Sequence, residues 1–245
     1  MLRRILLTAL AAGLLSGLAA FVLQQARVVP LIRQAEIYET RAALTQTAVA
    51  HAQHHPDGVA EETAPAEEDW EPAPGLERLG YTLMTDLLAG VGFGLILAGT
   101  FVLYEVAGGR IDAWRGVLWG LGGFVVFVAA PALGLPPEPP GSAAAALGDR
   151  QVWWIATAAA TALGLGLTIF SKVLSLRVLG VAALLVPHLI GAPHPVDEAG
   201  SVPATLAADF AIASLATAAA FWAVLGGLGG WVYHRLGMPE PVTPR

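Results

Sequence analysis

The chain has 245 residues, of which 56% are hydrophobic and only 13% are charged, and its mean hydropathy is +0.63. A soluble domain carries about 25% charged residues, so this composition excludes an ordinary globular enzyme. The net charge of −6 offers no overall basic surface for nucleic acid, and the lack of cysteine excludes disulfides, iron–sulfur clusters and thiolate metal sites.

Six apolar blocks of about 20 residues follow one another along the chain, each long enough to cross a hydrocarbon core of about 30 Å as a helix. The expected helices are Ile5–Leu23, Tyr81–Val106, Ala113–Leu135, Gln151–Phe170, Val173–Ile190 and Leu206–Val232. The first block follows two arginines as a secretory signal does, but its length and the lack of a clean cleavage site favour an uncleaved helix. The sequence therefore predicts an all-α, polytopic membrane protein, a bundle of six transmembrane helices in one integral membrane domain over residues 1–245.

The basic residues set the expected orientation, because cytoplasmic segments carry an excess of lysine and arginine. With the N-terminus inside, the inner side receives Arg3, Arg4, Arg110, Arg115, Lys172, Arg177, Arg235 and Arg245. The two short outer loops then hold only Arg150. We expect both termini to be cytoplasmic and the chain to lie in the cell inner membrane.

The first outer loop, over residues 24–80, is acidic and contains a histidine triplet. It carries ten carboxylates together with His51, His54 and His55. Imidazole and carboxylate suit divalent cations such as Co²⁺, Ni²⁺, Zn²⁺ and Cu²⁺, so the triplet favours weak metal capture outside the membrane. For the acids alone, an equally good interpretation is that Asp57–Pro74 is a solvated Pro/Glu/Ala-rich tether.

Two carboxylates, Asp86 and Asp209, lie within predicted spans, where a charged residue is expensive and indicates a function. Each follows a threonine by four residues, Thr82 and Thr205 respectively, and each is expected near the outer start of an inward-running helix. Two such strings at similar depth favour a cation site between helices. The alternative is helix-start chemistry, in which threonine caps the first turn and the carboxylate interacts with the helix dipole.

His188 follows Pro187 at the outer end of the fifth span. Proline removes a backbone hydrogen bond, and such interrupted helices supply ion ligands in transporters. In the alternative interpretation the helix ends there and His188 meets water. Glu105, near the inner end of the second span, is interpreted as a surface carboxylate, with an exit site as the alternative.

Small residues recur at four-residue spacing, which indicates close helix packing in lipid. The pairs are Gly13/Gly17, Gly90/Gly94, Gly116/Gly120 and Gly226/Gly230. No phosphate-binding loop and no hydrolytic motif is present in the sequence. We therefore expect neither an enzyme nor a tightly bound cofactor.

Three strings carry a family resemblance: the proline-rich run Ala130–Gly141, the segment Asp149–Trp154 with its Arg-Gln-x-Trp-Trp, and Pro187–Pro193. With the basic start and the histidine-bearing first loop, they make the chain resemble the CbtA family of proposed cobalt transporter subunits over nearly its whole length. The resemblance implies a membrane protein linked to cobalt supply for cobalamin synthesis. It also implies a small, single-span, histidine-bearing partner of the CbtB type.

The proline-rich run has physical content of its own. Its prolines are expected to hold the outer loop extended, and Arg150 is placed to pair with Glu138 or Asp149. A rigid loop beside the mouth of a pore and a simple stiff linker are equally good interpretations.

Together these features predict a permease component that takes up Co²⁺ or a similar divalent cation. In this hypothesis His51, His54 and His55 collect the ion, and Asp86, Asp209 and His188 form or flank the site where it enters the membrane. The first alternative is a metal-binding accessory or sensor subunit that does not transport, and the second is a membrane enzyme or scaffold with structural polar residues. The sequence leaves metal selectivity, energy source and homo-oligomer formation open.

Overall fold

The structure is a computed structural model that describes residues 1–53, 72–195 and 200–237, with side chains up to residue 45 in the first of these ranges. All regular secondary structure in these ranges is helical. The elements are α1 (Leu2–Arg27), α2 (Val29–Gln53), α3 (Leu76–Val106), α4 (Ala113–Phe124), η1 (Val125–Ala129), α5 (Ala130–Ala132), α6 (Leu147–Phe170), α7 (Leu174–Ile190) and α8 (Ala204–Gly237).

Five helices of the described part are long and apolar enough to cross a membrane. They are α1, α3, the α4–η1–α5 run over Ala113–Ala132, α6 and α8. The fifth predicted span is present as α7, an apolar helix of 17 residues that is shorter than the other five. At 1.5 Å per residue α7 is about 26 Å long, close to the lower limit for a spanning helix.

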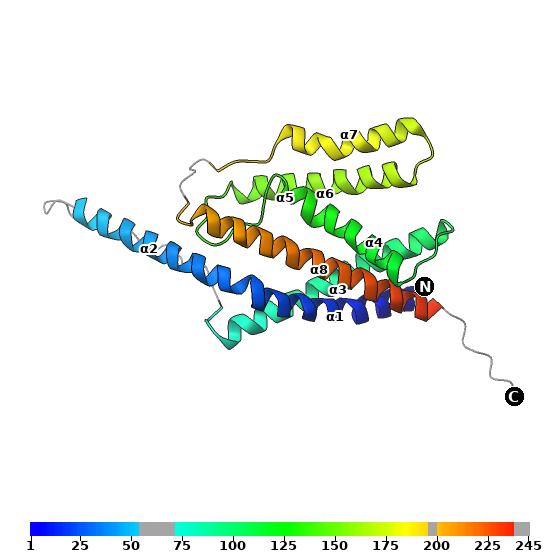
Figure 1. Ribbon diagram of the computed structural model, residues 1–245, viewed down its shortest axis with the longest axis horizontal. Coiled ribbons are helices and arrows are strands. Elements are labelled where there is room, and N and C mark those ends of the chain that lie inside the picture. The colour runs from blue at the N-terminus through cyan, green and yellow to red at the C-terminus, as the bar shows by residue number, and fades with distance from the viewer. Residues whose placement is uncertain (54–71, 196–199, 238–245) are drawn as a thin grey trace.

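The helix α2 corrects the expectation of one long loop over residues 24–80. α1 continues to Arg27, α2 follows after Val28, and α3 begins at Leu76, five residues before the expected start. The segment is rich in alanine, glutamate, glutamine and arginine, all strong helix formers, and its proline, Pro30, stands in the first turn where proline is tolerated. Hydropathy missed α2 because it is a polar helix. In Figure 1 it continues the line of α1 beyond the other helices.

α1 lies between α3 and α8 and is the centre of the bundle. Its buried face consists of small residues, including Ala9, Ala12, Gly13 and Ser16. A Cβ atom added at Gly13 would lie 2.6 Å from the carbonyl oxygen of Gly90, so the backbones of α1 and α3 touch at this crossing. The predicted role of these glycines in helix packing is confirmed.

α4 packs on α8 in the same way. A Cβ at Gly116 would lie 2.2 Å from the carbonyl oxygen of Gly226. Past this crossing the helix widens into the π-helical η1, in which the amide of Ala130 bonds to the carbonyl of Val125. Pro131 explains the widening, because it has no amide hydrogen to continue the α-helical pattern. The helix therefore ends at Ala132 rather than at the expected Leu135.

α6 and α7 form an antiparallel hairpin at the side of the bundle (Figure 1). α7 packs on α6 and on no other described helix, and α6 reaches the rest through η1 and α5. Aromatic side chains bridge the two parts, with Trp119 stacked on Phe170 at 5.8 Å and Phe127 beside Trp154 at 6.3 Å.

The start of α1 and the end of α8 lie at the same end of the molecule (Figure 1). Arg4 of α1 bonds both to Tyr233, near the end of α8, and to Glu105, near the end of α3. We call this the termini end. The starts of α6 and α8 lie at the opposite end, where the amide of Ser201 donates to the carbonyl of Gly141.

Candidate cation site

Asp86 lies in the interface between α3 and α1. Gln24 of α1 donates from Nε2 to Oδ1 of Asp86 at 2.9 Å. The other carboxylate oxygen, Oδ2, is buried and has no hydrogen-bond partner in the described residues. The helices are close here, since a Cβ at Gly17 would lie 2.5 Å from the carbonyl oxygen of Asp86.

This geometry leaves one buried carboxylate oxygen unsatisfied. A buried polar atom without a partner costs free energy, and more so if it is charged. A cation bound at Oδ2 would supply the missing partner, whereas Oδ1 already accepts a hydrogen bond from the side-chain amide of Gln24. Asp86 is also ten residues past the start of α3, so helix-start chemistry does not explain it.

Gln24 is the functional candidate that the sequence reading missed. The predicted first helix stopped at Leu23, which placed Gln24 in the loop, but α1 runs on to Arg27. One feature of the sequence could have identified Gln24. It is a polar residue directly after an apolar block, and on a continuous helix it lies on the same face as Gly13 and Gly17.

Asp209 lies at a different depth from Asp86. It is an exposed residue near the start of α8. The ring pairs Phe93–Phe221 and Phe101–Tyr233 set the register of α3 against α8. By this register Asp209 lies roughly two helical turns nearer the opposite end than Asp86. The expectation of equal depth does not hold, because α3 and α8 are offset along each other and the sequence pattern does not fix this offset.

His188 is half-buried in the last turn of α7, where its ring meets the ring of Trp153 edge-on at 6.1 Å. The helix continues through Pro187 to Ile190, so the proline does not break it. Because α7 packs only on α6 among the described helices, the structure does not bring His188 beside Asp86 or Asp209.

The histidine triplet can be placed only in part. His51 belongs to the helical backbone of α2, but its side chain, with all of His54 and His55, lies outside the described residues. Within the described part of the chain, no three histidine, aspartate or glutamate side chains gather closely enough to hold a metal ion. Metal capture by His51, His54 and His55 stays a prediction.

The proline-rich loop is fixed against α6. Arg150 pairs with Glu138, with 3.4 Å between Nη2 and Oε2, as one of the two predicted alternatives required. The loop, η1 and α6 line a largely apolar cavity of about 560 Å³, with this ion pair among its walls. The loop is therefore held in place by the hairpin.

The five apolar helices, with a carboxylate held between two of them, define a multi-pass α-helical membrane protein. The chain belongs to the CbtA family: the family model described as "Probable cobalt transporter subunit (CbtA)" matches residues 2–234, nearly the whole chain. No curated protein and no solved structure matches the chain significantly.

Proposed function

We propose that this protein is a membrane permease subunit that takes up a divalent transition-metal cation, with Co²⁺ favoured, for cobalamin synthesis. In this proposal it lies in the inner membrane with both termini in the cytoplasm. The observation that carries the proposal is the buried Oδ2 of Asp86, which has no hydrogen-bond partner among the described residues. It lies between two helices long and apolar enough to span a membrane, in a member of a family described as a probable cobalt transporter subunit. An anionic oxygen in that position is a natural ligand for a cation that crosses the membrane.

The other predicted residues fit a sequence of steps toward Asp86. His51, His54 and His55 precede α3 in the acidic segment and would collect the ion. Asp209, exposed and nearer the opposite end, would receive it before Asp86. His188, on the separate hairpin, would flank this path and bind the ion only if the hairpin moves against the bundle.

Transport by the purified chain is the direct test. The wild-type protein in vesicles should accumulate radioactive Co²⁺, and Asp86→Asn should lose at least about 90% of this flux because the amide keeps the shape but removes the anionic ligand. The matched control is Asp149→Asn, the same change at an exposed position in the first turn of α6. Unchanged flux in Asp86→Asn, with Asp149→Asn also unchanged, would remove Asp86 from the path.

A second candidate function is a metal-binding accessory or sensor subunit that does not transport by itself. Two observations favour it: the family is described as a transporter subunit, and no three histidine, aspartate or glutamate side chains gather in the described part of the chain. In that case a partner, such as the small histidine-bearing CbtB-like subunit, would complete the site. Vesicles with the chain alone would then show no flux, and adding the partner would restore it.

A further inference from the structure

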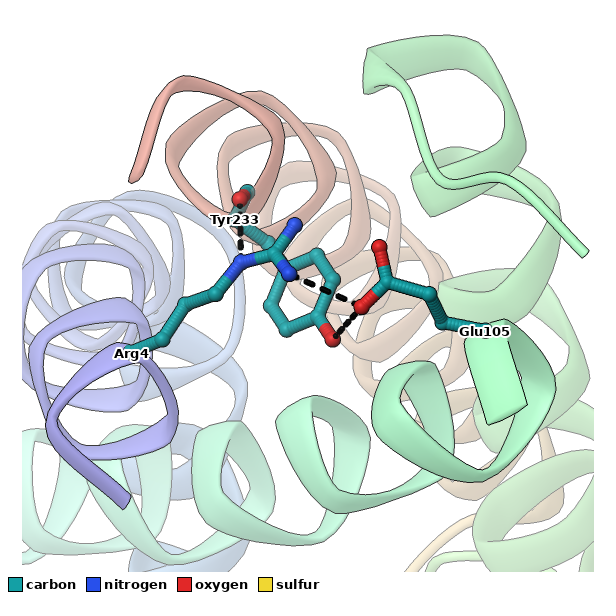
Figure 2. Close-up of polar contacts among 3 residues, drawn as sticks. All are labelled: Arg4, Glu105 and Tyr233. Carbon is teal, nitrogen blue, oxygen red and sulfur yellow. Dashed lines mark hydrogen bonds and ion pairs between the residues drawn. The ribbon is translucent and has the colours of Figure 1, made fainter. Parts of the chain in front are cut away.

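A second polar cluster joins the ends of three helices at the termini end, and the proposed uptake path does not use it. Figure 2 shows Arg4 of α1 between Glu105 of α3 and Tyr233 of α8. The guanidinium donates from Nη1 to Oε2 of Glu105 and from Nε to the carbonyl of Tyr233, both at 2.8 Å. The hydroxyl of Tyr233 donates to the same Oε2 at 2.7 Å.

The surroundings of Arg4 stabilise a positive charge at this position. The guanidinium carbon lies 3.5 Å from the centre of the Tyr233 ring, over its electron-rich face. Glu105 is in the last turn of α3, and Gly237 at the end of α8 lies against the Arg4 guanidinium, so two helix ends with partial negative charge are close to Arg4. The chain's own Arg4 occupies this place.

The groups around Arg4 are also ligands for a divalent cation. A carboxylate oxygen of Glu105 and the backbone carbonyl of Tyr233 accept hydrogen bonds from the guanidinium, and the phenolic hydroxyl of Tyr233 donates to the same carboxylate oxygen. Oxygen ligands of this kind suit hard and borderline cations. Oε1 of Glu105 accepts no hydrogen bond from the described residues. The Glu105 side chain is 39% exposed, against 22% for Arg4, so an ion can reach the carboxylate from solution.

We propose that Glu105 and the end of α8 around Tyr233 form a second divalent-cation site, at the termini end, in which Arg4 is a tethered occupant that an incoming cation must displace. Its place in transport rests on the proposed function, as the position where the ion leaves the membrane. Its binding chemistry does not, because it follows from the three residues alone. The sequence interpretation favoured a surface carboxylate at Glu105, with an exit site as the alternative, and it named no partners because Arg4 and Tyr233 are 101 and 128 residues away.

Contacts other than those of Arg4 also hold α1 in the bundle, which makes the site testable by mutation. The close contacts at Gly13 and Gly17 hold α1 on α3 roughly two and a half to three and a half turns further along. Arg3, the neighbour of Arg4, is exposed and provides a matched control with the same change of charge.

The test counts Mn²⁺ bound to the purified full chain at equilibrium, from the loss of the free-ion signal in electron paramagnetic resonance. Arg4→Gln should bind one more equivalent than the wild type, Arg3→Gln should not, and Arg4→Gln with Glu105→Gln should return to the wild-type count. An Arg4→Gln protein that is folded by circular dichroism but binds no extra Mn²⁺ overturns the proposal.

A second arm covers the case in which Arg4→Gln does not fold. At millimolar Mn²⁺ the wild type should hold one weak equivalent that Glu105→Gln lacks, because the ion then competes with Arg4. Equal binding by these two proteins overturns the proposal as well. Neither arm measures flux, so failure of this inference is distinguishable from failure of the transport proposal.

Discussion

At the scale of single residues, the pair Gln24–Asp86 links a packing contact to a candidate site. Gln24 fixes one carboxylate oxygen of Asp86, and the other is buried without a hydrogen-bond partner in the part of the chain that the structure describes. The carboxylate is thereby oriented before an ion arrives, which reduces the cost of ordering it on binding. Gln24 is therefore a positioning residue for Asp86 in the proposed path.

Replacing Gln24 with leucine should destabilise the protein through Asp86, because it leaves both carboxylate oxygens without a partner. Interhelical hydrogen bonds in membranes have coupling energies of about 0.6 kcal/mol on average and up to about 1.7 kcal/mol. A double-mutant cycle of Gln24→Leu with Asp86→Leu, followed by thermal unfolding in detergent, should give a coupling in this range. Gln25→Leu, one position along α1, is the control and should show no coupling with Asp86→Leu.

These residue pairs mark the limit of what could be predicted. The Arg150–Glu138 ion pair could be predicted because the two residues flank one loop, which leaves few possible partners for Arg150. Gln24–Asp86 and Arg4–Glu105 join different helices, and their partners depend on the rotation and register of those helices. Hydropathy predicts that a segment enters the membrane, but it determines neither the rotation of a helix nor its register against its neighbours.

At the scale of helices, glycine rows determine which helices touch. Gly13 with Gly90 brings α1 onto α3, and Gly116 with Gly226 brings α4 onto α8. In lipid the apolar side chains gain nothing by leaving hydrocarbon, so this close backbone approach supplies the packing energy. The spacing of these glycines in the sequence was therefore enough to predict their role, although not their partners.

Alanine substitutions along α4 should distinguish a glycine at a helix contact from a glycine that contacts nothing. At Gly116 a Cβ would meet the Gly226 carbonyl oxygen at 2.2 Å, so Gly116→Ala must push α4 from α8 and should cost about 1–3 kcal/mol. At Gly122 nothing lies within 4 Å, so Gly122→Ala should be neutral or stabilise by up to about 1 kcal/mol through helix propensity. Thermal unfolding of the purified variants measures both. Equal midpoints for the two variants would contradict the α4–α8 packing.

The helix α2 shows what the hydropathy pattern omits. Its glutamates and arginines kept it out of every apolar window, yet Glu36 pairs with Arg78 beside the start of α3. The acidic residues of the first loop are therefore divided: Glu36 and Glu39 belong to a helix, and most of the others lie outside the described residues. The interpretation as a solvated tether concerned Asp57–Pro74, and it stays a prediction.

At the scale of the whole molecule, the hairpin of α6 and α7 is attached to a tightly packed bundle of α1, α3, α4 and α8. The bundle is held by backbone contacts at glycines, whereas the hairpin is joined mainly by aromatic rings, η1 and the proline-rich loop. Asp86 and the Arg4 cluster both belong to the bundle, and His188 belongs to the hairpin. A movement of the hairpin would therefore shift His188 relative to both carboxylate sites and leave the sites themselves intact.

The distribution of charge over this shape predicts the orientation in the membrane. The start of α1, the α3–α4 and α6–α7 connections and the end of α8 share the termini end (Figure 1). They carry Arg3, Arg4, Arg110, Arg115, Lys172, Arg177 and Arg235. Basic segments of this kind stay in the cytoplasm, so the opposite end, with the starts of α6 and α8, should face outward.

Because the chain has no cysteine, single introduced cysteines can report this orientation without background. Ala144, in the connection before α6, and Ala107, just after α3, are both exposed and lie at opposite ends of the molecule. In intact spheroplasts a membrane-impermeant maleimide should label Ala144→Cys, whereas Ala107→Cys should react only after the membrane is opened. The reverse pattern would place Asp209 on the cytoplasmic side and Glu105 outside. Uptake from Asp209 to Asp86 would then become export, although the helix packing and both carboxylate environments would remain as described.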